Sequence, residues 1–316
     1  MIKLAPILLV GFIWLMIILT SSSLAREQFW ADLISSVTPH LVLIACGISL
    51  LVIFYRTQIG LTLLLVTLGI AWLKLPLLSS TDVPSQPTMR VFQFNLNYYN
   101  PNIRNVYQTL STKKPDLTVL FEVNDTNRAE FIALRDAYSD YGSDEREGFP
   151  DGIGIISKYP ILFRHKHAIF KNSVRGVIIE LVIAVGDKKM RILALHPPSP
   201  RTRTLWHKRN MMLLHLSNLL VEQTDIEHTI VIGDFNTHPQ SVHFPKLFNY
   251  SSCYELAGHY ASWAPITIPN TLYSVLGISI DHCLVSDSLS LHNFATLPFQ
   301  GSDHLALMYE LSFINE

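Results

Sequence analysis

An apolar run at residues 230–232 stops at Gly233 and is followed by an acidic and an amide side chain, Asp234 and Asn236. A strand that ends on glycine delivers its next side chains at the edge of a sheet, where residues two apart share one face. Carboxylate and amide oxygens suit a hard divalent cation with a phosphate group beside it. Because Gly-Asp-x-Asn is also good turn chemistry, the segment predicts a site only together with other motifs.

Five further strand-like apolar runs carry polar side chains at or near one end. These side chains are Asn95 with Asn97, Glu122, His196, Asp281, and Asp303 with His304. Each one alone is easily structural. All six segments together indicate a hydrolytic site, which must neutralise a phosphate, generate hydroxide from water and hold the two in line.

At these residues the chain resembles the endonuclease/exonuclease/phosphatase superfamily, the DNase-I-like metal-dependent phosphodiesterases. The matching motifs are, in order, Asn95, Pro115-Asp116…Glu122, Ser157-Lys158-Tyr159-Pro160, His196, Asp234/Asn236, Asp281 and Ser302-Asp303-His304. The resemblance covers residues 88–316 and implies an α/β domain built as a two-sheet β-sandwich flanked by helices. One departure is Phe121, where Gln is frequent in the family, and it should alter packing rather than chemistry.

The metal ligands are expected to be oxygen donors. Glu122 and Asn95 are the first candidates, Asp303 is a further carboxylate near the same ion, and Asn97 is the alternative to Asn95. Oxygen ligands favour Mg²⁺ or Mn²⁺, and the expected cofactor is one of these two.

The acid–base chemistry is expected of His304, because imidazole titrates near working pH. Such a histidine needs an orienting carboxylate, and Asp281 is costly to bury in an apolar strand unless it is paired. The resemblance implies that these two pair. Asp234 and Asn236 would orient and polarise the attacking water and bind a phosphate oxygen.

A second imidazole, His196, precedes the proline-rich residues 197–200, a rigid loop that would hold it facing the cleft. It matches a catalytic histidine of the DNase-like branch. Arg175 resembles a phosphate-contacting arginine of that branch, and a surface charge is the alternative. The basic stretch after His196 is either a solvated helix start or a contact for a second phosphate or for anionic lipid head groups, and its members are Arg201, Arg203, Lys208 and Arg209.

Several helical stretches are expected among the strands of this domain. Ile103, Val106, Tyr107 and Leu110 fall on one face, as do Phe131, Leu134 and Arg135 nearby, and residues 205–221 form a longer helix with Leu213, Leu216, Leu219 and Leu220 inward. The strands that alternate with these helices predict the α/β class.

The first 80 residues predict a membrane region. Residues 5–24, 38–55 and 59–78 are apolar stretches of about the length that crosses a bilayer. We expect two transmembrane helices at 38–78, joined by a turn near Arg56, and a third at 5–24. A cleaved signal peptide is the alternative for 5–24, and an uncleaved anchor is favoured because the run is long.

The predicted organisation is a membrane region at 1–78, a linker at 79–87 and a catalytic domain at 88–316. Lys3 and Arg56 would be cytoplasmic under the positive-inside rule, and the loop at 26–37 would lie outside, so the domain is expected on the non-cytoplasmic side. Of the three cysteines, Cys46 lies in the predicted membrane region, whereas Cys253 and Cys283 are isolated, and no disulfide framework or zinc spacing is recognisable.

Charge bears on the substrate. After residue 80 the chain carries 20 Lys and Arg against 23 Asp and Glu, a balance of −3. Proteins that hold nucleic acid are usually strongly basic, so nucleic acid is a possible but unfavoured substrate beside lipid or small phosphodiesters. The predicted function is a membrane-anchored metal-dependent phosphoesterase. The rival is a catalytically silent membrane module that uses the fold for binding; no protein partner is implied.

Overall fold

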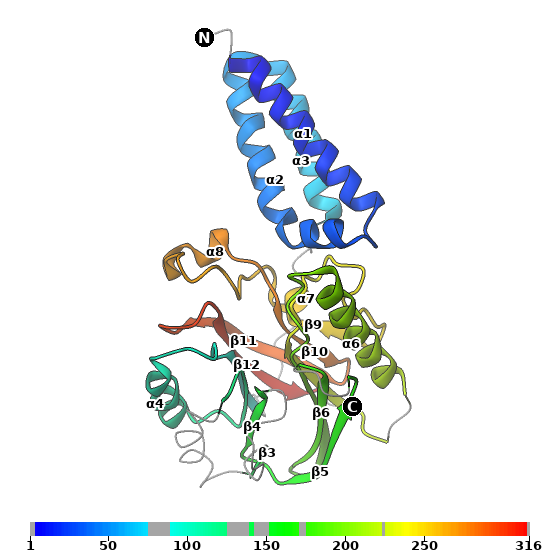
Figure 1. Ribbon diagram of the computed structural model, residues 1–316, viewed down its shortest axis with the longest axis vertical. Coiled ribbons are helices and arrows are strands. Elements are labelled where there is room, and N and C mark those ends of the chain that lie inside the picture. Colours follow the sequence, from blue (N-terminus) through cyan, green and yellow to red (C-terminus); the bar gives the residue numbers. More distant parts are fainter. Residues whose placement is uncertain are drawn as a thin grey trace. The chain divides into compact units, whose positions relative to one another are not determined.

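The computed structural model describes residues 4–74, 89–124, 139–141, 152–170, 175–222 and 225–314. The chain forms two compact units, each of which is drawn in Figure 1. One unit contains the N-terminal helices together with Thr237–Phe244, and the other contains the remaining described residues.

The N-terminal helices are α1 (Leu4–Leu24), α2 (Phe29–Tyr55) and α3 (Thr57–Lys74). By length and composition α1 and α2 are candidate membrane spans, and Thr57–Leu73 is a shorter apolar helix. The expected loop at 26–37 is wrong, because helix α2 already begins at Phe29. Residues 29–37 contain no glycine or proline to end a helix, so the turn is confined to a few residues, where the Gln28 amide donates to the Ala25 carbonyl.

The second unit contains two six-stranded sheets (Figure 1). The first has the order β11-β12-β1-β2-β4-β3, and the second has the order β5-β6-β7-β8-β10-β9. The strands of the first sheet are β1 (Met89–Asn95), β2 (Leu117–Phe121), β3 (Ser139–Tyr141), β4 (Gly154–Ser157), β11 (Leu289–Pro298) and β12 (Leu305–Phe313). Those of the second are β5 (Ile161–Ala168), β6 (Val177–Val185), β7 (Lys188–Leu195), β8 (His228–Asp234), β9 (Tyr250–Ser252) and β10 (Asp281–Ser286).

The sheets pack through one apolar core, and the period of two along each strand supplies it. Val91 of β1 lies in this core with Ile192 and Ile232 of the other sheet, while Phe92 and Phe94 face the opposite side of β1. There they meet helix α4 (Ile103–Lys113), which buries Val106, Tyr107 and Leu110 as expected. The predicted sandwich is therefore present.

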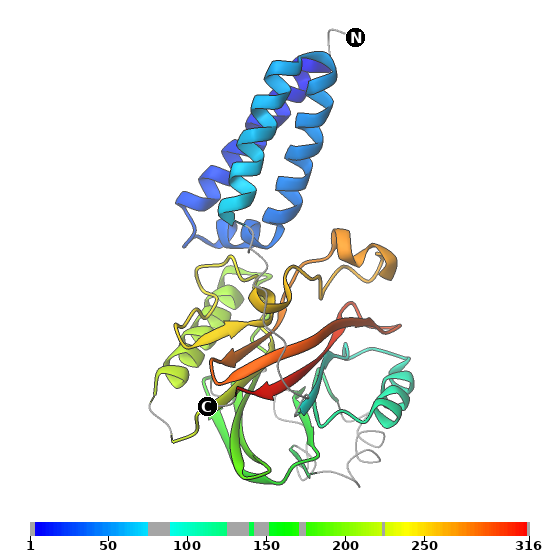
Figure 2. The same cartoon turned by 180° about the vertical axis from the view of Figure 1, so that it is seen from behind.

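A second helix, α6 (Arg203–Val221), lies on the other side of the sandwich from α4 (Figures 1 and 2). It buries the four leucines predicted to face inward, Leu213, Leu216, Leu219 and Leu220. Arg191 of β7 donates to the Leu219 carbonyl at 3.0 Å and ties the helix to the sheet. The helical face expected around Phe131 lies outside the described residues.

Strand direction brings six strand ends to one edge. β1 and β2 run parallel, as do β7 and β8, so the carboxyl ends of these four strands point the same way within each sheet. β12 is antiparallel to β1, and β10 is antiparallel to β8, so these two begin where the others end. In the second sheet the register places Asp281 opposite Asp234.

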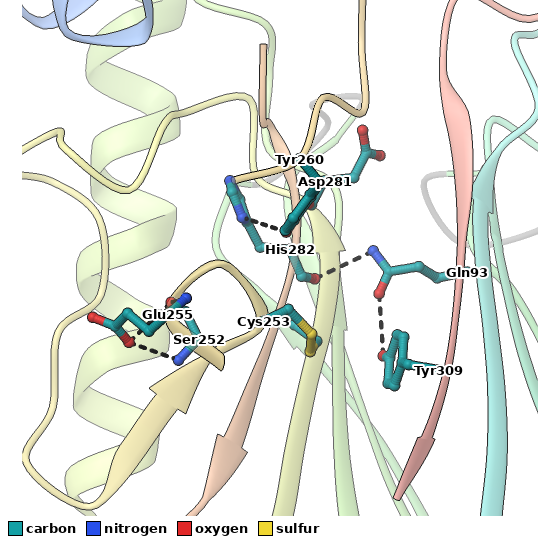
Figure 3. Close-up of a disulfide and its surroundings, with 9 residues drawn as sticks. Gln93, Ser252, Cys253, Glu255, Tyr260, Asp281, His282 and Tyr309 are labelled. Carbon is teal, nitrogen blue, oxygen red and sulfur yellow. Dashed lines mark hydrogen bonds between the residues drawn. A yellow bond between two sulfur atoms is a disulfide. The ribbon is translucent and has the colours of Figure 1, made fainter. Parts of the chain in front are cut away.

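The cysteines differ from the sequence expectation. Cys253, at the start of α7 (Cys253–Ala257), is joined by a disulfide to Cys283 of β10 with a Cα–Cα distance of 5.2 Å (Figure 3). The two are adjacent because β9 pairs with β10 in the register Ser252 opposite Leu284. A separation of 30 residues carries no local signature, and sheet pairing alone brings the two together.

Candidate active site

The Oδ2 atom of Asp234 is the point at which three strand ends meet. Asn95 donates to it from Nδ2 at 3.0 Å, Nε2 of His196 lies 3.3 Å away and Nε2 of His304 lies 3.7 Å away. The other oxygen, Oδ1, accepts the backbone N–H of Asn236 at 3.0 Å. Burial by itself raises the pKa of the Asp234 carboxyl, but His196, His304 and Asn95 together hold that pKa well below its usual range. Asp234 is therefore an anion fixed among nitrogen donors.

His304 and Asp281 form a buried pair, with Nδ1 of His304 2.8 Å from Oδ2 of Asp281. Burial lowers the pKa of His304, yet the carboxylates of Asp281 and Asp234 raise it to about 10. Burial raises the pKa of Asp281, although His304 opposes this. The two carboxylates therefore favour the protonated form of the imidazole, whose Nε2 lies on the side of Asp234. The structure thus brings together the pair that the sequence predicted.

Glu122 lies on the other side of His196. Its Oε1 is 3.9 Å from Nε2 of His196 and 2.5 Å from Nη2 of Arg175, and its Oε2 accepts the backbone N–H of Tyr98 at 3.0 Å. The Arg175 guanidinium also lies 5.8 Å from the centre of the Tyr98 ring. A predicted metal ligand and a predicted phosphate contact therefore form an ion pair with each other.

Asp303 is held through both carboxylate oxygens. Asn97 donates from Nδ2 to Oδ1 at 3.0 Å, and the Trp263 indole N–H donates to Oδ2 at 2.9 Å. The backbone N–H of Asn97 in turn donates to Oδ1 of Asn95 at 3.0 Å. Asn95, Asn97 and Asp303 are thus one connected group, and each acceptor oxygen keeps a second lone pair for a ligand.

Backbone strain gathers at these residues. Six described non-glycine residues have positive φ, and four of them are site residues, namely Asn97, Glu122, Arg175 and Asn236. A left-handed backbone is uncommon for Glu and Arg, and such outliers persist only where the surroundings hold them. Their concentration at one strand edge is typical of a functional site.

Asn236 and the basic stretch are arranged differently from expectation. The Asn236 amide donates to the Pro197 carbonyl at 3.1 Å, on the rigid loop after His196. Arg209 is buried, donates to the Asn236 carbonyl at 2.9 Å and also contacts Asn210. Arg209 is thus a support for the Asp234–Asn236 turn and is not available to a second phosphate.

Two sequence motifs lie away from the site. Asp116 precedes β2, whereas Glu122 follows it, and Ser157 pairs in register with Leu117 at the same distant end. There Asp116 accepts from the Arg90 amide and from Lys158 at 2.9 Å, and Ser157 closes a turn with Tyr159. These residues of the family pattern stabilise strand ends at the end of the sheet away from Glu122.

The donor set fits a divalent cation. Asp234, Asp281 and His304 each offer a ligand atom, all within 4.8 Å of one another. Two of these three already share a hydrogen bond, which an ion between them would have to displace. Glu122 and Asp303 supply further carboxylates, the ligands that suit Mg²⁺ and Mn²⁺.

The ring of His196 contains buried nitrogens that lack hydrogen bonds to the described residues. Both ring nitrogens of His196 are buried without an aligned hydrogen-bond partner among the described residues. A buried polar atom of this kind is costly unless a ligand or a water satisfies it. Its Nε2 lies between the carboxylates of Asp234 and Glu122, so the ligand would be bound at the centre of the site.

Known proteins share the sequence pattern and the fold of this chain. Residues 92–304 match the model of the Endonuclease/Exonuclease/phosphatase family. Truncated TDP2 from Caenorhabditis elegans is similar in structure, with a TM-score of 0.60 and 18% identity, covering 72% of this chain and 98% of that chain. No curated protein matches the sequence.

Two further solved structures share the fold. The human Nocturnin catalytic domain with bound sulfate anion has a TM-score of 0.54 and 18% identity, covering 74% of this chain and 97% of its own. The 3′ phosphatase NExo from Neisseria bound to product DNA hairpin has a TM-score of 0.55 and 15% identity, covering 71% of this chain and 100% of its own. At these identities the likeness concerns the fold, and the predicted DNase-I-like sandwich is confirmed.

Proposed function

Because the chain belongs to the endonuclease/exonuclease/phosphatase family, as its motifs predicted, we propose that it is a membrane-anchored, divalent-metal-dependent phosphoesterase that hydrolyses phosphodiester bonds. The observation that carries the proposal is the environment of Asp234. One buried carboxylate oxygen lies within 3.7 Å of nitrogen atoms from Asn95, His196 and His304. Such a fixed anion beside two imidazoles is suited to orient a water molecule.

Some residues of the site are proposed to act on the attacking water and others on the phosphate. A divalent cation held by Glu122, Asn95 and Asp303 would neutralise phosphate oxygens and lower the pKa of bound water. Asp234 orients the attacking water through Oδ2. His304, whose pKa is raised by the carboxylates of Asp281 and Asp234, would face the phosphate with Nε2 and stabilise the charge that builds in the transition state, while Asp281 fixes the ring through Nδ1.

His196 and Arg175 complete the contacts with substrate. The imidazole of His196, which lies between Asp234 and Glu122 with no aligned hydrogen-bond partner among the described residues, gives a hydrogen bond to a phosphate oxygen. Arg175 is paired with Glu122 in the structure, and its guanidinium would contact a phosphate oxygen if Glu122 held a cation instead.

The chemical class of the substrate follows from charge. A balance of −3 outside the first 80 residues gives little attraction for a long polyanion. We therefore favour lipid or small phosphodiesters, although the Neisseria neighbour is bound to product DNA and keeps nucleic acid among the candidates.

The catalytic domain is proposed to lie outside the cytoplasm. The candidate spans α1 and α2 support an anchor, and the Cys253–Cys283 disulfide supports an oxidising compartment, since such bonds are rare in the cytosol. Lys3 and Arg56 on one side of the helices favour the same orientation.

One experiment tests the activity. The full-length chain in detergent is assayed with Mn²⁺ or Mg²⁺ against duplex DNA, single-stranded DNA, phospholipid and a chromogenic phosphodiester, with and without chelator. Asp234→Asn serves as the inactive variant, and Asp187→Asn, in the exposed turn between β6 and β7, is the matched control. Metal-dependent hydrolysis that is lost only in Asp234→Asn supports the proposal. Binding without hydrolysis of any substrate would instead favour the catalytically silent module.

A further inference from the structure

A short segment, residues 260–263, runs between the two strands that carry the acid–base pair. The backbone N–H of Ser262 donates to the Ile278 carbonyl at 2.9 Å, just before β10, and its carbonyl accepts from Leu305 at 2.7 Å, the first residue of β12. Trp263 forms isolated bridges with both Ile278 and His304. This segment, called the brace here, touches the start of both strands.

The brace holds the backbone of Asp281 from two sides. The Ser262 hydroxyl oxygen accepts from the backbone N–H groups of Ile280 and Asp281, at 3.0 and 2.9 Å. The Tyr260 hydroxyl donates to the Asp281 carbonyl at 2.8 Å, and Figure 3 shows Tyr260 beside Asp281 and His282. Tyr260, Ser262 and Asp281 are all buried, so these bonds form away from competing water.

The next residue of the brace holds a second carboxylate. The Trp263 indole N–H donates to Oδ2 of Asp303 at 2.9 Å, and Asn97 occupies the other oxygen, so the carboxylate is fixed in rotation as well as in position. Indole N–H is a donor only and cannot reverse the bond. Neighbouring residues of one segment thus fix the two acids on either side of His304.

We propose that Trp263 and Ser262 are positioning residues, which set the orientation of Asp303 and Asp281 and thereby the alignment of the cation and His304 on the phosphate. Neither touches the reacting atoms. The inference rests on the proposed function, in which Asp303 binds the cation and Asp281 orients His304. Misplacement by about an ångström is enough to cost rate in such a site.

The sequence alone gave no signal for this role. Ser262-Trp263 stands in no strand-end pattern, and its link to Asp303 spans 40 residues. The segment reaches the site through contacts such as the pairing of Trp263 with both Ile278 and His304, which form only after the chain has folded.

Trp263→Phe tests the first half of the proposal, because it keeps an aromatic ring and removes the donor. We expect binding of Mn²⁺ by calorimetry to weaken about tenfold and kcat to fall about 10- to 100-fold, the range for a lost hydrogen bond to a charged group. The substrate KM should change little, since the bond acts on the transition state. Trp206→Phe in α6 is the matched control and should leave both quantities unchanged.

Ser262→Ala tests the second half, with Ser286→Ala as control. Ser286 also accepts a backbone N–H, that of Thr229 at 3.0 Å, but at the far end of β10. The melting temperature should fall by a similar amount in both variants. The kcat per folded molecule should fall only in Ser262→Ala. Equal losses of kcat in the two serine variants, or unchanged Mn²⁺ binding in Trp263→Phe, would overturn the proposal. If the wild-type chain hydrolyses nothing, the proposed function fails, while Mn²⁺ titration of Trp263→Phe still decides the role of the indole.

Discussion

Nδ1 of His304 lies 2.8 Å from Oδ2 of Asp281, so the residue just before β12 is hydrogen-bonded to the first residue of β10. β10 belongs to the second sheet and β12 to the first, so this bond joins the halves of the sandwich at the site. The imidazole ring can then present only Nε2 to a substrate, and the pair works as one unit.

The first prediction follows from that unit. Asp281→Asn and His304→Ala should each lower turnover by a factor on the order of 10² to 10⁴, the range for a positioned acid–base group. The double variant should be little worse than either single variant. Turnover is measured beside melting temperature, because Asp281→Asn keeps its shape and should stay folded. Rate losses that multiply in the double variant would mean that the two residues act separately.

The second prediction concerns the cation. Hydrolysis should vanish with chelator, and Glu122→Gln should weaken Mn²⁺ binding measured by calorimetry, because a neutral amide is a poorer ligand for a hard ion. Glu310→Gln is a close control, since Glu310 pairs with Arg90 and both glutamates have side chains that are 14% exposed. Full activity in excess chelator, or equal loss of Mn²⁺ binding in both variants, would contradict the assignment.

The third prediction compares two buried histidines. His196→Ala should lower kcat by about 10²-fold or more, because its ring nitrogens have no other aligned partner and lie between two acidic side chains. His228→Ala, at the opposite end of β8, removes a ring that bonds Ser288 at 2.9 Å and should lower stability alone. Rates corrected for folded fraction separate the two effects. If kcat per folded molecule were similar in the two variants, His196 would have a role in packing and not in catalysis.

The fourth prediction is a pH dependence of stability. Burial alone would raise the pKa of Glu180, but hydrogen bonds from Arg191 and His167 hold it below its ordinary value. A carboxyl whose pKa is lower in the folded state stabilises the fold above its unfolded pKa, and that contribution is lost as pH falls through the folded pKa.

Thermal unfolding between pH 6 and pH 3 measures this contribution. Glu180→Gln should cost about 1–3 kcal/mol at pH 6, the range for a hydrogen bond to a charged group, and less at pH 3. The melting temperatures of the wild type and the variant should therefore converge in acid. A constant difference between them across this range would show that proton binding to Glu180 is not the cause.

The fifth prediction concerns the compartment. In a Cys46→Ser background, the denatured chain should react with maleimide only after reduction, because Cys253 and Cys283 are paired. A reporter active only outside the cytoplasm, fused after residue 316, should be active. Two free thiols without reduction, or activity of a cytoplasmic reporter alone, would contradict the proposed orientation.

The polar residues at the strand ends could be predicted from the sequence because each one follows a local pattern of apolar residues. Asn95, Glu122 and His196 each follow an apolar run, and parallel pairing makes such ends converge without further information. Asp234 and Asp281 are opposed in register for the same reason. The alternating strands and helices predicted the α/β class, and the family resemblance implied the two-sheet sandwich. The domain boundaries and the roles of the site residues stay predictions.

Contacts between segments far apart in the chain could not be predicted from the sequence. The indole of Trp263, the disulfide of Cys253 and the ion pair between Arg175 and Glu122 all depend on which loops meet after the sheets have packed. The start of α2 at Phe29 was missed for another reason, since polar residues there suggested a loop although none of them ends a helix.

The hydrogen bonds of the site join very distant parts of the chain. Asn95 and Asp234 are separated by 139 residues, and Asn97 and Asp303 by 206. β1, near the beginning of the domain, pairs with β12 at its end. A growing polypeptide that has not yet delivered β12 therefore has no complete site, and long-range pairing of this kind forms slowly. The proposed hydrolysis would therefore require a chain whose synthesis has extended through β12.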